Sequence, residues 1–155
     1  MSFTIKIAGF GNKREILTSE TARYIRWLRP YANVSITLLK TSSYKKRRRE
    51  QQVEEEGKRL MLLWPDPSYP IALSEEGKSF TSASFAEWLA KRRIQRVPLV
   101  ITVGGAYGLA PKLKQECREI LSLSPLTFPH RLCYHILLEQ LYRACTILEN
   151  HPYHK

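Results

Sequence analysis

Cysteine, acidic residues and long apolar runs are all scarce in this sequence of 155 residues. The three cysteines, Cys117, Cys133 and Cys145, are odd in number, form no CxxC pair and fall in helix-like segments, so they are typical of reduced thiols in a core. No apolar run approaches the roughly 20 residues that span a bilayer. The N-terminal stretch MSFTIKIAGFGNKRE lacks the layout of a signal peptide. We therefore expect a cytoplasmic protein.

The shortage of acidic residues leaves a large positive charge. Twenty-five Lys and Arg stand against 14 Asp and Glu, for a net charge of +11. Such an excess favours a polyanionic partner, because Lys and Arg that contact phosphates release condensed counterions. A membrane surface also attracts basic side chains, but no segment has the pattern of a basic amphipathic helix with an aromatic apolar face. Nucleic acid is therefore the favoured partner.

The pattern along the chain predicts one α/β domain over residues 1–155 with a mostly parallel sheet, because strand-like and helix-like segments alternate. The apolar run 97–103 is typical of a strand covered on both faces. Thr18 or Ser19 is expected to cap one helix, and Ser79 or Thr81 another. The expected strands are 3–10, 33–40, 71–74 and 97–103, and the expected helices are 19–29, a segment ending at Trp64, 85–93, 110–121 and 132–148.

Two groups of glycines follow predicted strands. Gly9 and Gly11 make half of a dinucleotide-binding fingerprint, but Arg14 stands where the third glycine belongs, so we reject that interpretation. Gly104 and Gly105 follow the buried strand 97–103. Ligands of open α/β sheets bind at the carboxyl ends of strands, where glycines let the backbone approach them. A ligand site and a plain tight turn are equally compatible with this pattern.

The stretch SLSPLTFPH, Ser122–His130, is unusual for a surface loop. Apolar residues alternate with small polar ones, and two prolines interrupt any regular element. Surface loops are usually polar and carry Gly, Asn or Asp. The pattern predicts a stiff loop that is buried against something, and a purely structural role is the simplest interpretation of the loop alone.

Three stretches together resemble one family. GGAYGL at 104–109, SLSPLTFPH at 122–130 and the segment 138–155, from LEQLYRA to NHPYHK, are similar in order and spacing to the RlmH family of SPOUT-class methyltransferases. The resemblance implies a C-terminal deep trefoil knot, a homodimer in which the tail of one subunit completes the site of the other, and ribosomal RNA in the assembled ribosome as the substrate. The last helix is apolar enough to serve both the core and such an interface.

The resemblance also implies S-adenosylmethionine as the cofactor. Leucine and phenylalanine walls would bury the flat adenine, backbone groups of a stiff loop would bind its edge, and glycines would leave room for the other arms of the cofactor. Methyl transfer from a sulfonium needs no metal. By resemblance, the residues around the cofactor are Leu73, Gly104, Gly105, Leu123, Ser124, Pro125, Leu126, Thr127 and Phe128.

The implied acceptor is N3 of the pseudouridine at the 1915 site, an imide nitrogen that must lose its proton. We expect Tyr153 and His154 to contact this nucleotide and Arg143 to orient it or a phosphate. His130 belongs to the pocket loop and is equally compatible with a structural role, while Glu139 is expected to position the helix rather than to act as a base. The tail HPYH lacks partners at zinc-ligand spacing, so no metal site is expected.

Two departures from the family pattern and two alternatives remain. Ser74 stands where relatives often carry an acidic residue, which predicts a weaker contact with the ribose or amino group of the cofactor. The linker TSSYKKRRRE is more basic than usual, so Lys45–Arg49 is either an RNA-backbone contact or a solvated loop. The alternatives are a knotted methyltransferase that acts on tRNA or another ribosomal base, and a non-catalytic ribosome-binding protein.

Overall fold

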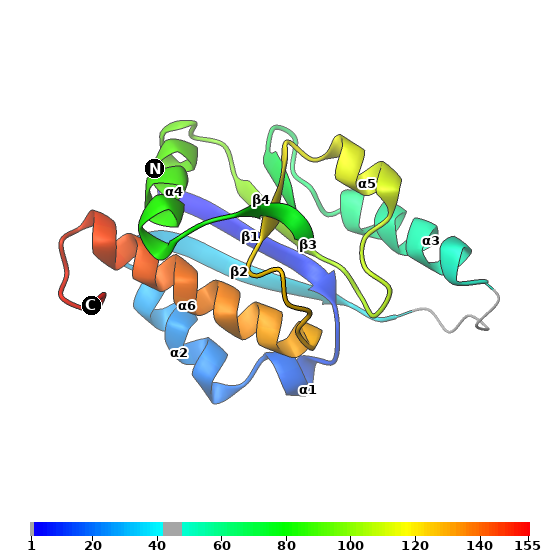
Figure 1. Ribbon diagram of the computed structural model, residues 1–155, viewed down its shortest axis with the longest axis horizontal. Helices are drawn as coiled ribbons and strands as arrows, with labels where there is room; N and C mark the ends of the chain where they lie inside the picture. Colours follow the sequence, from blue (N-terminus) through cyan, green and yellow to red (C-terminus); the bar gives the residue numbers. More distant parts are fainter. Residues whose placement is uncertain (1, 42–47) are drawn as a thin grey trace.

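A single five-stranded sheet lies between two layers of helices in the computed structural model, which describes residues 2–41 and 48–155 (Figure 1). The elements in chain order are β1 Phe3–Phe10, α1 Lys13–Ile16, α2 Ser19–Leu28, β2 Ala32–Leu39, α3 Arg49–Met61, β3 Tyr69–Ser79, α4 Ser82–Ile94, β4 Leu99–Val103, α5 Pro111–Glu116, β5 Glu119–Ser122 and α6 His130–Leu148.

The sheet has the strand order β2-β1-β4-β3-β5, and every neighbouring pair is parallel. This confirms the predicted α/β class and parallel sheet. All five residues of β4 at the centre are buried, as the apolar run predicted. Because the strands are parallel, their carboxyl ends meet at one edge of the sheet, where the loops after β3, β4 and β5 come together.

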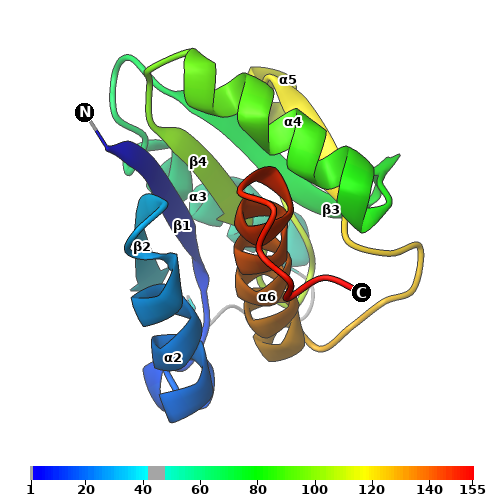
Figure 2. The ribbon, with the colours of Figure 1, turned by 90° about the vertical axis from the view of Figure 1, so that its left-hand side faces the viewer.

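Helices cover both faces of the sheet. On one face α6 packs between α2 and α4 (Figure 2), and their shared core contains Tyr134, Leu138 and Leu141 of α6. On the other face α3 packs against α5 over a smaller core that includes Leu60 and Leu113. No helix among residues 2–41 and 48–155 is long and apolar enough to cross a membrane.

The predicted helix starts and stops are largely confirmed. Thr18 caps α2 and Thr81 caps α4, each through a reciprocal pair of hydrogen bonds with the residue three positions on. The basic run Lys45–Arg49 falls mostly outside the described residues, but Arg49 opens α3. All three cysteines are free, and burial raises the pKa of Cys117 to about 12 and of Cys145 to about 11, so these thiols stay protonated at neutral pH.

The predicted helix 110–121 is wrong in its second half. Helix α5 ends at Glu116, and Glu119–Ser122 form the edge strand β5. The backbone N–H of Arg118 donates to the carbonyl of Pro70 at 2.8 Å, and β5 then pairs along β3. A four-residue strand owes its stability to this pairing, which local periodicity does not reveal.

The glycine pair after β1 has a packing role. A side chain at Gly9 would collide with the hydroxyl of Tyr134, which is fully buried and donates to the carbonyl of Phe10 at 3.1 Å. This contact joins the end of β1 to α6. The space beside Gly9 is thus filled by protein, consistent with rejecting a dinucleotide site there.

Candidate functional site

A pocket of about 700 Å³ opens at the carboxyl ends of β3 and β4. Three segments line it: 73–76 of β3, 103–109 after β4, and most of 123–130 between β5 and α6. Lys114 and Cys133 complete the wall. The volume is in the range of small-molecule sites.

The structure brings together eight of the nine residues that the resemblance assigned to the cofactor. They are Leu73, Gly104, Gly105, Leu123, Ser124, Leu126, Thr127 and Phe128. Pro125 is exposed and does not line the pocket. The sequence analysis predicted that the loop Ser122–His130 is buried. In a single chain this prediction is wrong, because Leu126 keeps 69% of its surface exposed.

Polar contacts tie the walls of the pocket to one another. The hydroxyl of Thr127 donates to Oε2 of Glu75 at 2.7 Å, which joins the loop before α6 to β3. Nζ of Lys114 lies 2.5 Å from Oε1 of Glu76. The residue after Leu73 is Ser74, which lacks a carboxylate, but the next two positions supply carboxylates to the same wall. The pocket thus combines apolar surface with negative charge, which suits a cofactor that carries a sulfonium and an ammonium group.

The turn after β4 depends on close backbone approach. A Cβ atom at Gly104 would lie 2.6 Å from the carbonyl carbon of Gly108, which is a backbone atom and cannot turn aside as a side chain can. Gly108 has a φ of +80°, and its N–H donates to the carbonyl of Gly105 at 3.1 Å. A side chain at Gly105 would instead point toward Glu56, 3.4 Å from Oε2. Gly104 is therefore the residue on which the shape of the turn depends, whereas a side chain at Gly105 would meet the flexible end of Glu56, and the backbone of Gly105 still lines the pocket.

Glu56 is a residue that the sequence analysis missed. It lies on α3 behind the glycine turn and is only 6% exposed. Oε1 accepts a hydrogen bond from Gln52 at 3.2 Å, whereas Oε2 is buried without a hydrogen-bond partner in the described part of the chain. Burial is the main cause that raises the pKa of this carboxyl group. Nothing local distinguishes it from Glu54 and Glu55 beside it, so only the packing of α3 reveals it.

Replacing Glu56 with glutamine is expected to stabilise the fold at neutral pH. Because the pKa of Glu56 is raised above its ordinary value of 4.5, the folded chain holds this proton more tightly than the unfolded chain. That stabilisation is complete below the ordinary value and is lost as the pH rises through the raised pKa. Near neutral pH, Glu56→Gln should therefore unfold at a higher temperature than the unmodified chain, with a free energy of unfolding about 1 kcal/mol larger. This difference in stability should vanish in acid.

Thermal unfolding followed by circular dichroism at several pH values measures this effect. Glu54→Gln, at an exposed position of the same helix, is the matched control and should show no such trend. A gain for Glu56→Gln that is the same at all pH values would contradict the assignment to a buried carboxylate.

The three predicted tail residues form a second cluster, centred on Glu139 of α6. Oε1 of Glu139 accepts from Nη2 of Arg143 at 2.6 Å, from Nε of Arg143 at 2.9 Å and from the hydroxyl of Tyr153 at 3.1 Å. Nη1 of Arg143 lies 3.1 Å from Nδ1 of His154, and its guanidinium stacks 4.9 Å from the ring centre of Tyr153. Glu139 thus joins the tail to α6, whereas the sequence analysis expected it to position the helix.

The charges of this cluster are set by its own contacts. The hydrogen bond to Glu139 is the main cause that raises the pKa of Arg143, so this side chain is a permanent cation. Burial, followed by a hydrogen bond with Tyr24, raises the pKa of Tyr153 well above its ordinary value. Tyr153 is therefore a proton-bearing hydrogen-bond donor at neutral pH and not a base.

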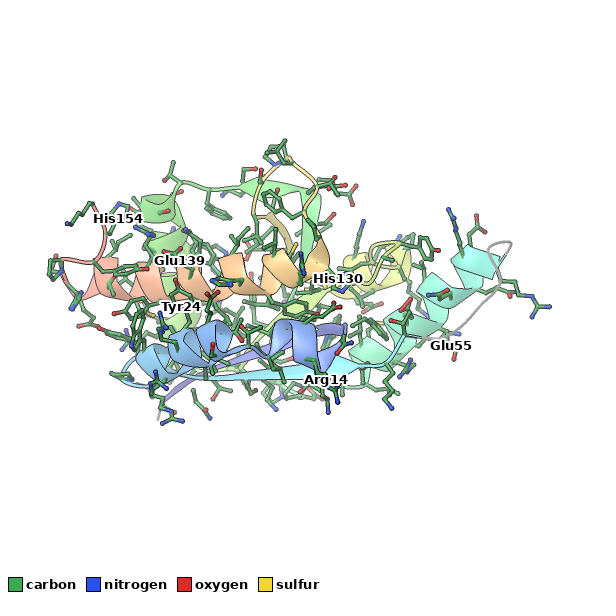
Figure 3. All side chains as sticks on the ribbon, turned by 90° about the horizontal axis from the view of Figure 1, so that it is seen from below. Arg14, Tyr24, Glu55, His130, Glu139 and His154 are labelled. Atoms are coloured by element: carbon green, nitrogen blue, oxygen red, sulfur yellow. The ribbon has the colours of Figure 1, made fainter. Side chains whose placement is uncertain are left out.

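The pocket contacts the start of α6, whereas the tail cluster is centred on Glu139, halfway along the helix. Figure 3 labels His130 at the start of α6, and Glu139 and His154 of the cluster. The pocket contacts this helix at His130 and Cys133, while the cluster is built on Glu139 and Arg143. Ten residues separate Cys133 from Arg143, which corresponds to about 15 Å along an α-helix. The two parts of the predicted site do not meet within one chain.

The side chains that line the pocket are compatible with S-adenosylmethionine. Within residues 2–41 and 48–155, no group of three or more His, Cys, Asp and Glu side chains is placed to hold a metal ion. The apolar side chains of Leu73, Leu123 and Phe128 suit adenine, and the carboxylates of β3 suit the positive charges of the cofactor.

Comparisons with known proteins agree with this geometry. Residues 1–154 match the family described as "Predicted SPOUT methyltransferase". The chain is 36% identical over 151 residues to the Ribosomal RNA large subunit methyltransferase H of Gloeobacter violaceus, which covers 97% of both chains. It is 34% identical over 151 residues to the protein of the same name from Pseudothermotoga lettingae, which covers 97% of this chain and 98% of that one.

A solved structure shares the fold. The structure of a probable methylase family protein from Haemophilus influenzae matches this chain with a TM-score of 0.57. The match covers 100% of this chain and 72% of that protein's chain. The sequence identity is 14%, so this likeness concerns the fold alone.

Proposed function

This chain belongs to the SPOUT methyltransferase family, and on that premise we propose that it methylates large-subunit ribosomal RNA with S-adenosylmethionine as the methyl donor. The observation that carries the proposal is the meeting of the GGAYGL turn and the SLSPLTFPH loop around one pocket at the carboxyl ends of the strands. Relatives that are similar over nearly their whole length bear the name of such an enzyme.

The residues of the pocket bind and orient the cofactor. S-adenosylmethionine supplies an electrophilic methyl group, which needs only an in-line nucleophile in a site that excludes water. Leu73, Leu123 and Phe128 bury the adenine, and the turn at Gly104 presents backbone groups to the rest of the molecule. The hydrogen bond between Thr127 and Glu75 holds the two walls at a fixed separation, which lowers the ordering cost of binding.

The tail cluster acts on the acceptor. The proposed acceptor is N3 of the pseudouridine at the 1915 site, which carries negative charge once its proton is lost. Arg143, a permanent cation, stabilises this charge, and the imidazole of His154 lies beside it to hydrogen-bond the base. The Tyr153 hydroxyl already donates to Glu139, so Tyr153 contacts the nucleotide through its ring, which lies against the guanidinium. Glu139 holds the guanidinium and the phenol in place.

A homodimer reconciles the two parts of the site. Because Glu139 and Arg143 of the tail cluster lie about 9 and 15 Å along α6 from Cys133 of the pocket, we infer that a second copy brings its tail to that pocket. Trp27 and Leu132, on α2 and α6, are 40% and 43% exposed and offer apolar surface for this contact. The C-terminal trefoil knot implied by the family belongs to the same proposal, as does a cytoplasmic site of action on the assembled ribosome.

Mass mapping of ribosomal RNA from cells with and without this gene tests the function. We expect one methyl group to disappear from a single pseudouridine of the large subunit and to return when purified protein and S-adenosylmethionine are added to the unmethylated ribosomes. An unchanged methylation pattern would reject the proposed reaction. Calorimetry with S-adenosylmethionine then separates a methyltransferase with another RNA target, which binds the cofactor, from a non-catalytic ribosome-binding protein, which does not.

A further inference from the structure

One aromatic side chain at the rim of the pocket has no role in the site described above. Tyr107 lies in the turn after β4, lines the pocket and keeps 46% of its surface exposed. An exposed aromatic ring at the mouth of a binding pocket loses hydrophobic stabilisation unless something covers it. The other aromatic ring of the pocket, Phe128, is half-buried in the wall.

A cation lies against the ring of Tyr107. The guanidinium carbon of Arg49, in the first turn of α3, is 4.6 Å from the ring centre. This contact joins the rim of the pocket to α3. It covers part of the ring and restrains it, so that the ring loses little further freedom when a ligand stacks on it.

We propose that Tyr107, supported by Arg49, is a stacking platform for a nucleobase of the RNA substrate at the mouth of the cofactor pocket. The inference rests on the proposed function and assigns a residue that contacts its substrate. Bases that are unstacked from RNA lie on aromatic side chains and on arginine planes, and this mode of binding needs no particular base.

Replacing Tyr107 is expected to weaken the binding of RNA and to leave the binding of the cofactor unchanged. Tyr107→Ala should raise the KM for ribosomes about tenfold, since stacking of one base contributes that much or more, and should leave the Kd for S-adenosylmethionine unchanged. Tyr107→Phe keeps the ring and should behave like the unmodified chain. Arg49 acts through the ring as a positioning residue, so Arg49→Gln should raise the KM less than Tyr107→Ala does, and the double variant should match Tyr107→Ala alone.

Steady-state methyl transfer to unmethylated ribosomes, calorimetry with S-adenosylmethionine and ribosome co-sedimentation test this with the full chain. Arg26→Gln, which removes an exposed cation from α2, is the charge control and should leave all three unchanged. An unaltered KM for Tyr107→Ala, or an equal loss of cofactor affinity, would overturn the platform. Additive effects of Arg49→Gln and Tyr107→Ala would overturn the positioning role. If the unmodified chain transfers no methyl group, the proposed function fails, and co-sedimentation of Tyr107→Ala alone decides the platform.

Discussion

Replacing Gly104 with alanine is expected to lower the affinity for S-adenosylmethionine about a hundredfold, since forcing a methyl group into a close-packed site costs up to about 3 kcal/mol. The new Cβ atom would lie 2.6 Å from the carbonyl carbon of Gly108. The atoms that the new Cβ would meet belong to the backbone of Gly108, so the turn must open and the pocket wall that it forms must shift. Calorimetric titration with the cofactor measures the loss.

Gly105→Ala is the matched control for this prediction. Its Cβ atom would lie 3.4 Å from a carboxylate oxygen of Glu56, which is a side-chain atom, so a small adjustment suffices. We expect its cofactor affinity to stay within a few-fold of the unmodified chain. Circular dichroism should show both variants folded. A folded Gly104→Ala chain with undiminished affinity would remove the turn from the binding site.

Removing residues 150–155 should lower the rate of methyl transfer about a thousandfold or more. The affinity for S-adenosylmethionine should stay nearly unchanged. The truncation takes away Tyr153 and His154, and Arg143 loses the partners that stack on it and hydrogen-bond to it. Helix α6 ends at Leu148, so the cut keeps every residue of the helix. It removes the hydrogen bonds that Asn150 and His151 donate to the last turn of the helix and the ring contact between Tyr153 and Tyr142. Methyl transfer to ribosomes and calorimetry with S-adenosylmethionine measure the two effects separately.

Two inactive variants together provide the control. In an equimolar mixture of the truncated chain and Gly104→Ala, half of the dimers contain one of each, and one of their two sites combines an intact pocket with an intact tail. About a quarter of the activity should return if the tail serves the pocket of the partner. Full activity of the truncated chain alone would refute the role of the tail, and a mixture without activity would refute its service across the dimer.

Local pattern predicted those elements whose stability is itself local. The caps Thr18 and Thr81 depend on residues three positions apart, and the structure has them as expected. Strand β4 pairs with the distant strands β1 and β3, but its continuous apolar run is a signal within the chain itself. Strand β5 was predicted as helix because its stability comes from pairing with β3, about 50 residues earlier. The resemblance supplied the candidate pocket residues, since no propensity relates the GGAYGL turn to the SLSPLTFPH loop.

The sequence by itself determined the α/β class, the parallel sheet and the family, because periodicity and ordered motifs are properties of the chain alone. Only the tertiary structure decided that Glu56 is buried behind the glycine turn, that Arg49 stacks on Tyr107, and that the tail cluster stands apart from the pocket of its own chain. These contacts join residues from separate elements. Their distances depend on how helices pack on the sheet, and a single sequence contains no local signal of that packing.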